Sequence, residues 1–228
     1  MRILFVNYEY PPLGGGGGVA CAGVAEALAQ RHEVHVLTSG RTGLPAFEAR
    51  AGVRIWRAPV LGRGQRAVAS LPSLLAFFPL GLRLGARLCR RHRFDLVASW
   101  FAVPSGTVGA VLARRFGLPH SIHVMGSDVH GPAMWYAPPS NRPLAALVGR
   151  LLRRAERVTA PSADLARHAQ ALAGAGTAVE IIPHGVAPPA RGPFAPPLTS
   201  PYVLVVATGY PHKDLPTALR TVLRLRRG

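Results

Sequence analysis

The sequence is poor in cysteine, in lysine and in carboxylates. Its 228 residues include two cysteines, Cys21 and Cys89, and a single lysine, Lys213. The two cysteines lie in expected helices and form no motif, which indicates inert thiols in a reduced, cytoplasmic compartment. Ten carboxylates stand against 27 basic residues, so the net charge is +17.

The sequence also lacks a secretory signal and a long hydrophobic run. Met1-Arg2 leads directly into a short apolar strand rather than into an apolar segment with a cleavage site. The longest apolar stretch, residues 67–82, contains Pro72 and Pro79 and ends at Arg83. It is too short and too broken to span a bilayer.

The strong positive charge does not by itself indicate a nucleic-acid partner. No helix-turn-helix, zinc-finger or aromatic RNA-binding signature accompanies it. The arginine bias, together with the richness in alanine, glycine and proline, is typical of a high-GC coding habit. A basic face towards anionic lipid or towards a phosphorylated substrate is the better use of this charge.

Short apolar strands alternate with helices along most of the chain, the pattern of a parallel sheet covered on both faces. The expected strands are Arg2–Asn7, Glu33–Thr38, Val53–Ala58, Asp95–Ser99, Ser121–Met125, Arg157–Ala160 and Glu180–Ile182. The expected helices are Val19–Arg31, Leu71–Arg91, Ser105–Phe116, Arg142–Arg154 and Ala163–Leu172. The fold class is therefore α/β, with a Rossmann-like sheet.

A proline-rich stretch divides the chain into a large first domain and a short remainder. Residues 1–185 form the first domain, and residues 186–200 read as a linker without helical period. Residues 201–228 hold one fresh strand, Tyr202–Ala207, and one fresh helix, Leu215–Arg226. One strand and one helix cannot bury their own faces, so we expect them to begin a second, incomplete Rossmann-like domain.

The first strand runs into five consecutive glycines, Gly14, Gly15, Gly16, Gly17 and Gly18, just before a helix. Missing side chains permit close approach, and the free N–H groups of the helix attract a phosphate. A dinucleotide site would also need an acid at the end of the second strand, where the sequence reads Thr38-Ser39-Gly40. That alternative and a turn without any ligand are weaker interpretations.

The histidines and aspartates do not form a pattern typical of a metal site. Nine histidines are present, but none shows a spacing of two histidines and an acid, and no Asp-x-Asp pair exists. A metal-dependent sugar transferase of the single-domain type is therefore not favoured. We expect no metal and no other cofactor.

Polar residues follow several strands at the expected carboxyl edge of the sheet, where open parallel sheets bind ligands. His123 to His130 includes Asp128, which can accept from a sugar hydroxyl, and histidines that can donate or accept. The alternative is a loop-capping aspartate with satisfied histidines. Residues 181–186 run from a strand towards the linker, and Lys213 lies in a strand–helix loop where an ammonium can meet a phosphate.

Taken in order, these segments resemble family 4 of the retaining, nucleotide-sugar-dependent glycosyltransferases with the two-domain GT-B fold. The matching segments cover nearly the whole chain. They are Glu9-Tyr10-Pro11-Pro12 with the glycines, Val124-Met125-Gly126-Ser127-Asp128-Val129, Val158-Thr159-Ala160-Pro161-Ser162, Ile182-Pro183-His184-Gly185-Val186 and Pro211-His212-Lys213-Asp214-Leu215.

The resemblance implies two Rossmann-like domains that face a cleft, with the acceptor in the first and most of the donor in the second. Lys213 would neutralise the leaving diphosphate, and the glycines 14–18 would lie against it or against the sugar. Asp128 is the implied catalytic residue in the first-domain wall. Glu9, Tyr10, His123, Ser127 and His184 are the implied acceptor-side or cleft-wall residues.

The sequence departs from the family pattern at three places. Met125 stands where many relatives have a histidine before Gly-x-Asp, and Ala207-Thr208 stand where many have Gly-Arg. The Glu-x7-Glu donor motif of the family does not occur after Lys213. We therefore expect this chain alone to be inactive.

The expected function is transfer of a sugar from a nucleotide-diphosphate sugar to a hydroxyl acceptor, in cell-envelope or polysaccharide synthesis. The alternatives are a truncated sugar-binding remnant and a dinucleotide-dependent sugar-modifying enzyme. Leu71, Leu74, Leu75, Phe78 and Leu82 can form an apolar stripe followed by arginines 83, 87, 90, 91 and 93. Such a helix can lie on the anionic inner face of the cell membrane, where a lipid-linked acceptor would be found, or pack in the core with a solvated basic end.

Overall fold

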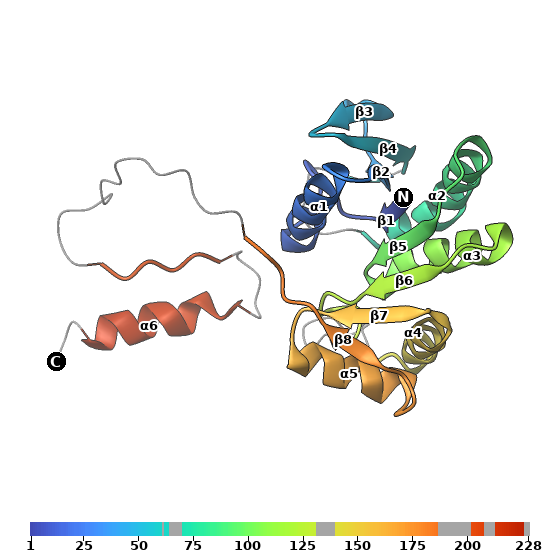
Figure 1. The fold of residues 1–228 in the computed structure, drawn as a ribbon. Coiled ribbons are helices and arrows are strands. Elements are labelled where there is room, and N and C mark those ends of the chain that lie inside the picture. Colours follow the sequence, from blue (N-terminus) through green and yellow to red (C-terminus); the bar gives the residue numbers. More distant parts are fainter. Residues whose placement is uncertain (61, 64–69, 131–139, 187–201, 208–212, 226–228) are drawn as a thin grey trace.

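The computed structural model describes the chain except for residues 61, 64–69, 131–139, 187–201, 208–212 and 226–228. Eight strands form one sheet in the order β3-β4-β2-β1-β5-β6-β7-β8 (Figure 1). The strands are β1 Arg2–Asn7, β2 Glu33–Gly40, β3 Phe47–Arg50, β4 Val53–Pro59, β5 Leu96–Trp100, β6 His120–His123, β7 Arg157–Ala160 and β8 Val179–Ile181. The helices are α1 Gly16–Ala29, α2 Leu71–Arg91, α3 Thr107–Phe116, α4 Arg142–Arg154, α5 Ala163–Ala173 and α6 Leu215–Leu225, with a short irregular helical turn, η1, at Ala102–Gly106.

The sheet is parallel apart from β3, which pairs antiparallel with β4. This confirms the expected α/β class, but β3 was missed. Its segment, Phe47-Glu48-Ala49-Arg50, is short, polar and mostly exposed, so no buried run marks it. A tight turn creates it: Ala51 and Gly52 both have positive φ, 48° and 79°, as two-residue hairpin turns require.

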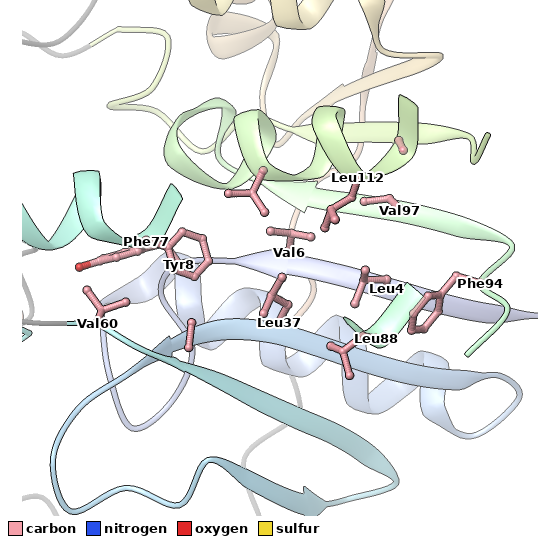
Figure 2. Close-up of a cluster of buried hydrophobic side chains, with 13 residues drawn as sticks. Leu4, Val6, Tyr8, Leu37, Val60, Phe77, Leu88, Phe94, Val97 and Leu112 are labelled. Carbon is pink, nitrogen blue, oxygen red and sulfur yellow. The ribbon is translucent and has the colours of Figure 1, made fainter. Parts of the chain in front are cut away.

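The two faces of the sheet are covered unequally. On one face the side chains of Ile3 and Phe5 pack with Cys21 and Ala25 of α1. On the other face Leu4 and Val6 pack in a cluster with residues of α2 and α3 (Figure 2). The strands β6 and β7 extend this second face beneath α4 and α5. Because β1 and β2 are covered on both faces, almost every residue of these two strands is buried, including polar ones.

Helix α2 is the longest helix among the described residues and the one whose length and composition would allow it to cross a membrane. This corrects the expectation that the stretch is too short and too broken, because the helix extends beyond the apolar run to Arg91. It is continuous through Pro79, and its face with Phe77, Gly81 and Leu88 is buried. Gly85 is needed for this close packing, because a Cβ there would lie 2.5 Å from Leu112 Cδ1 of α3. Leu74 and Leu82 of the expected apolar stripe also pack against this core.

The C-terminal segment differs from the rest of the described chain. Helix α6 forms where a helix was expected, but none of its residues is buried. Residues 202–207 are exposed and pair with no strand in the described part of the chain, so the expected strand is not formed. The physical reason is that a strand exists only with a hydrogen-bonded neighbour. The expected linker lies, beyond Val186, outside the described residues, and the division into domains stays a prediction.

The contact between α4 and α5 gives a stability test. A Cβ on Gly149 would meet the backbone carbonyl oxygen of Leu172, which cannot rotate away. We expect Gly149→Ala to lower the free energy of unfolding by about 1–3 kcal/mol, measured by urea denaturation. Gly23→Ala on α1, where a Cβ meets nothing within 4 Å, is the control and should raise it by about 0.5–1 kcal/mol. Equal effects would contradict the packing argument.

Candidate functional site

The candidate site lies at the carboxyl edge of the sheet, where β1, β5, β6 and β7 end side by side. After Asn7 the chain leaves the sheet, passes through Glu9 and the glycines, and enters α1 at Gly16. The backbone N–H of Tyr8 donates to Ser105 Oγ (2.9 Å), and Ser39 Oγ donates to the carbonyl of Tyr8 (2.7 Å). The loop therefore starts from a firmly held residue.

Three of the five glycines are required by close packing. Gly14 has φ +96°, and a Cβ there would lie 2.5 Å from Glu9 Cβ. A Cβ on Gly17 would lie 2.5 Å from Phe101 Cζ, and one on Gly18 would lie 2.8 Å from the carbonyl oxygen of Glu9. These glycines let the loop fold back onto Glu9 and onto the end of β5, without any ligand.

The remaining two glycines face open space. A Cβ on Gly16 would meet nothing within 4 Å, and one on Gly15 only Glu9 Oε2 at 4.0 Å. Gly15 is the N-cap of α1 and supplies no side-chain cap, while its own N–H donates to Glu9 Oε2 (3.1 Å). In the described part of the chain, the N–H groups of Gly16 and Gly17 have no acceptor outside the helix. This uncapped helix start is suited to an anion.

Asp128 is buried and holds the loop that follows β6. Its Oδ2 accepts from the N–H of Ala102 (2.8 Å), and its Oδ1 accepts from Met125 (3.0 Å) and Gly126 (2.9 Å). Burial raises the pKa of this carboxyl, and the three backbone donors act against that rise. This geometry matches the alternative of a loop-capping aspartate, so Asp128 is a positioning residue. Its catalytic role stays a prediction.

The structure brings together His123 and His184, which are 61 residues apart. Their Nε2 atoms lie 2.8 Å apart, so one donates to the other, and His123 Nδ1 lies 2.7 Å from Thr159 Oγ1. Trp100 packs on both imidazoles, with ring centroids 4.5 Å and 5.7 Å away. Burial, with the charge of His184, lowers the pKa of His123 to about 4, and burial lowers the pKa of His184.

The other expected site residues are placed differently. Ser127 is exposed beside buried Asp128. Tyr10 is 3% exposed and packs with Cys21 and Ala25, which differs from an open cleft wall, and burial raises the pKa of its phenol. Lys213 is exposed just before α6, and residues 208–212 of its loop lie outside the described part of the chain. Its phosphate role stays a prediction.

Sequence reasoning missed two aromatic residues of this site, Trp100 and Phe101. Trp100 packs on the histidine pair, and Phe101, with φ 70°, lies against Gly17. Met125, the departure from the family pattern, also lies near Gly17, since a Cβ there would be 3.3 Å from its Cε. The signal that points to these residues is the position of β5 next to β1, which only the strand order reveals.

A polar cluster at the opposite, amino edge was also missed. The ligand atoms of Glu33, His35 and His92 lie within 4.8 Å of one another, although no spacing in the sequence suggests it. Trp56 Nε1–H donates to His35 Nδ1 (3.2 Å), so His35 Nε2 carries the proton that it donates to Glu33 (3.0 Å). Arg2 and Arg54 pair with the same carboxylate. Among the described residues His92 Nε2 is buried without a hydrogen-bond partner, but the two arginines on the Glu33 carboxylate make the cluster poorly suited to a cation.

Comparison with known proteins decides the family. The model of Glycosyltransferase Family 4 matches residues 14–188, well over half of the chain. The chain belongs to Glycosyltransferase Family 4. A curated relative of this family 4 chain, an uncharacterized glycosyltransferase of Methanocaldococcus jannaschii, is 44% identical over 59 residues, which are 25% of this chain and 15% of the relative.

Solved structures agree on the fold of this family 4 chain, which is the GT-B Rossmann-like fold. Sucrose-phosphate synthase from Thermosynechococcus elongatus superposes with a TM-score of 0.65 at 16% identity, over 81% of this chain and 48% of that one. The calicheamicin glycosyltransferase CalG4 gives 0.50 at 14% identity, over 87% and 55%. The chain thus spans about half the length of these relatives.

The neutral histidine pair predicts a pH dependence. A lowered pKa means that the unfolded chain binds more protons, so the stabilisation is complete above pH 6.5 and is lost as the pH falls towards 4. We expect His123→Asn to flatten the decline of the free energy of unfolding between these values, measured by urea denaturation at each pH. Ser127→Ala in the same loop removes no titrating group and should keep the slope of the parent chain. An unchanged slope in His123→Asn would contradict the assignment.

Proposed function

We propose that this chain is the acceptor-side part of a retaining glycosyltransferase that moves a sugar from a nucleotide-diphosphate sugar to a hydroxyl. The observation that carries the proposal is the uncapped start of α1 at Gly15 and Gly16, which faces open space at the carboxyl edge of the sheet. Membership of Glycosyltransferase Family 4 supports it. Cell-envelope or polysaccharide synthesis is the proposed setting.

The chemistry requires positive charge where the diphosphate leaves. Glycosyl transfer passes through an oxocarbenium-like centre while negative charge develops on the departing phosphate oxygens. Fixed N–H groups of Gly16 and Gly17 stabilise that charge without a metal, and Lys213 adds an ammonium once the donor side is complete. We propose that no metal takes part.

The acceptor hydroxyl would lie against the wall formed by His184, Ser127 and Glu9. Because burial lowers the pKa of both imidazoles, they are neutral at pH 7, and they would bind a hydroxyl through hydrogen bonds and not through charge. One carboxylate oxygen of Glu9 holds Gly15, which leaves the other to accept from a sugar. Asp128 shapes this wall by holding the loop.

A peripheral position on the cytoplasmic face of an anionic membrane is also proposed. Leu71, Leu75 and Phe78 of α2 are 52%, 66% and 41% exposed, although Leu74 and Leu82 pack against the core. These three residues share one helical stripe, and Arg83 and Arg87 are exposed further along the helix. Apolar contact and arginine attraction together suit an anionic surface and a lipid-linked acceptor.

The start of α1 at Gly15 and Gly16, here called the donor cradle, is tested with protein from the full reading frame, assayed for release of nucleoside diphosphate from nucleotide sugars. We expect Gly16→Val to lower turnover at least about tenfold, because the added methyls fill the space in which the diphosphate would lie. Gly23→Val is the matched control, since a Cβ at either position meets nothing within 4 Å. Lys213→Ala in the same assay tests the ammonium. Equal turnover in Gly16→Val and Gly23→Val would show that the donor cradle does not bind the diphosphate during the reaction.

Membrane contact is tested by flotation with phosphatidylglycerol vesicles. We expect Leu75→Glu to reduce binding at least about fivefold, because it places a carboxylate in the stripe that enters the anionic interface. The control is Val111→Glu on α3, which is also exposed, at 43%. Equal losses in the two variants would show that α2 has no special contact with lipid.

A further inference from the structure

Arg63 carries a buried positive charge that has no counter-ion in the described part of the chain. The residue is 6% exposed, and its guanidinium carbon lies 4.6 Å from the centroid of the Tyr8 ring. Its Nε and Nη2 atoms are buried and have no hydrogen-bond partner there. Neither the sequence motifs nor the proposed donor cradle account for this arginine.

An unpaired guanidinium in this position requires an explanation. Arginine does not lose its proton in proteins, so burial cannot neutralise it, and a buried charge without a partner is costly. Arg57 shows the usual solution in the same molecule. It is 3% exposed, and although its Nε and Nη1 are also unpartnered, Nη2 donates to Glu48 (2.7 Å) and to the carbonyl of Pro11 (3.1 Å). Arg63 lacks such a carboxylate.

The surroundings of Arg63 hold hydroxyls that can rotate to donate to an anion. In this structure they donate within their own network, since Ser73 Oγ donates to the Ser70 carbonyl (2.7 Å). The Tyr8 hydroxyl lies 2.7 Å from Ser73 Oγ in the first turn of α2, and Ser70 is the N-cap of that helix. Ser70 Oγ and Ser73 Oγ are 3.0 Å apart. The positive end of the helix dipole points to the same place. Figure 2 shows Tyr8, Phe77 and Val60 together at this end of the cluster.

We propose that Arg63, with the hydroxyls of Tyr8 and Ser70 at the start of α2, binds a phosphate group of the acceptor. Nε–H and Nη2–H lie on one edge of a guanidinium and point in parallel, so the two unpaired atoms form the fork that binds two phosphate oxygens. Hydroxyls outside the guanidinium plane suit a tetrahedral group. The inference rests on the proposed function, because it assigns the acceptor of that same site.

The position connects this subsite to both neighbouring surfaces. Tyr8 directly precedes Glu9, which accepts from the N–H of Gly15, so this subsite and the glycine loop both follow the end of β1. Leu71 and Leu75 of the same helix start are exposed beside it. The phosphate therefore belongs either to a lipid headgroup, whose tails would cover the stripe, or to a free sugar or polyol phosphate.

The test measures binding of inorganic phosphate to the 228-residue chain by calorimetry, against chloride at equal ionic strength. We expect Arg63→Met, which still covers Tyr8, to weaken binding at least about tenfold, and Arg63→Lys to weaken it less, since a charge remains without the fork. Arg114→Met on α3 replaces another exposed arginine, and as the matched control it should bind as the parent chain does. Without phosphate, Arg63→Met should unfold at the same or a higher temperature, because an unpaired buried charge is gone.

Two further ligands identify the source of the phosphate. Arg63-dependent binding of glycerol 3-phosphate indicates a free acceptor, whereas Arg63-dependent binding only to phosphatidylglycerol vesicles indicates a lipid headgroup. Equal phosphate binding by Arg63→Met and Arg114→Met would overturn the proposal. So would absence of phosphate binding together with a lower unfolding temperature of Arg63→Met, since Arg63 would then be a structural cover of Tyr8. These binding measurements do not depend on sugar transfer. A failure of the phosphate-site proposal is therefore distinguishable from a failure of the proposed transferase activity.

Discussion

The candidate site depends on the hydrogen bonds that fix the position of Tyr8. Where β1 ends, the N–H of Tyr8 is held by Ser105, its carbonyl by Ser39, and its hydroxyl by Ser73. These partners come from η1, β2 and α2, so three separate elements fix one residue. Because both backbone groups are bonded outside the strand, the chain turns away from the sheet in one defined direction. The glycine loop follows from that turn.

The glycine loop and the Asp128 loop meet because each is tied to the end of β5. Gly17 lies against Phe101, and Asp128 accepts from the N–H of the next residue, Ala102. The Asp128 carboxylate therefore positions two loops at once, and this rigidity requires that the carboxylate be buried away from water. An open helix start and a wall of neutral imidazoles are consequently held at a fixed separation. Such fixed dipoles suit the proposed sugar transfer, because charge that develops in the reaction would need no reorganisation of the site.

Positive charge is distributed over this molecule in two distinct ways. Most of the arginines that the structure describes are exposed, where water solvates their charge. Arg57 and Arg63 are instead buried next to the loop at Tyr8–Pro11, one with a carboxylate and one without. The composition alone cannot distinguish these cases, since burial decides whether a guanidinium needs a partner. The proposed phosphate site therefore rests on the unpaired arginine and not on the net charge.

Much of the fold could be predicted from local pattern. The strands from Arg2, Glu33 and Val53 and the helix from Leu71 to Arg91 lie where apolar runs and period indicate them, because buried parallel strands need continuous apolar residues. β3 escaped prediction because its residues are exposed and its pairing depends on a turn. The prediction of a strand at Tyr202–Ala207 was wrong, because strand pairing needs a neighbour that this stretch does not have in the described chain.

The sequence by itself determined the α/β class, the glycine loop at a helix start and the family, since each is carried by residues that are neighbours in the chain. Only the tertiary structure decided which glycines are packed and which are open, and that Asp128 is turned inward. It also decided that His123 meets His184 and that Arg63 is buried without a counter-ion. These outcomes depend on contacts between residues far apart in the sequence, and no local pattern specifies them.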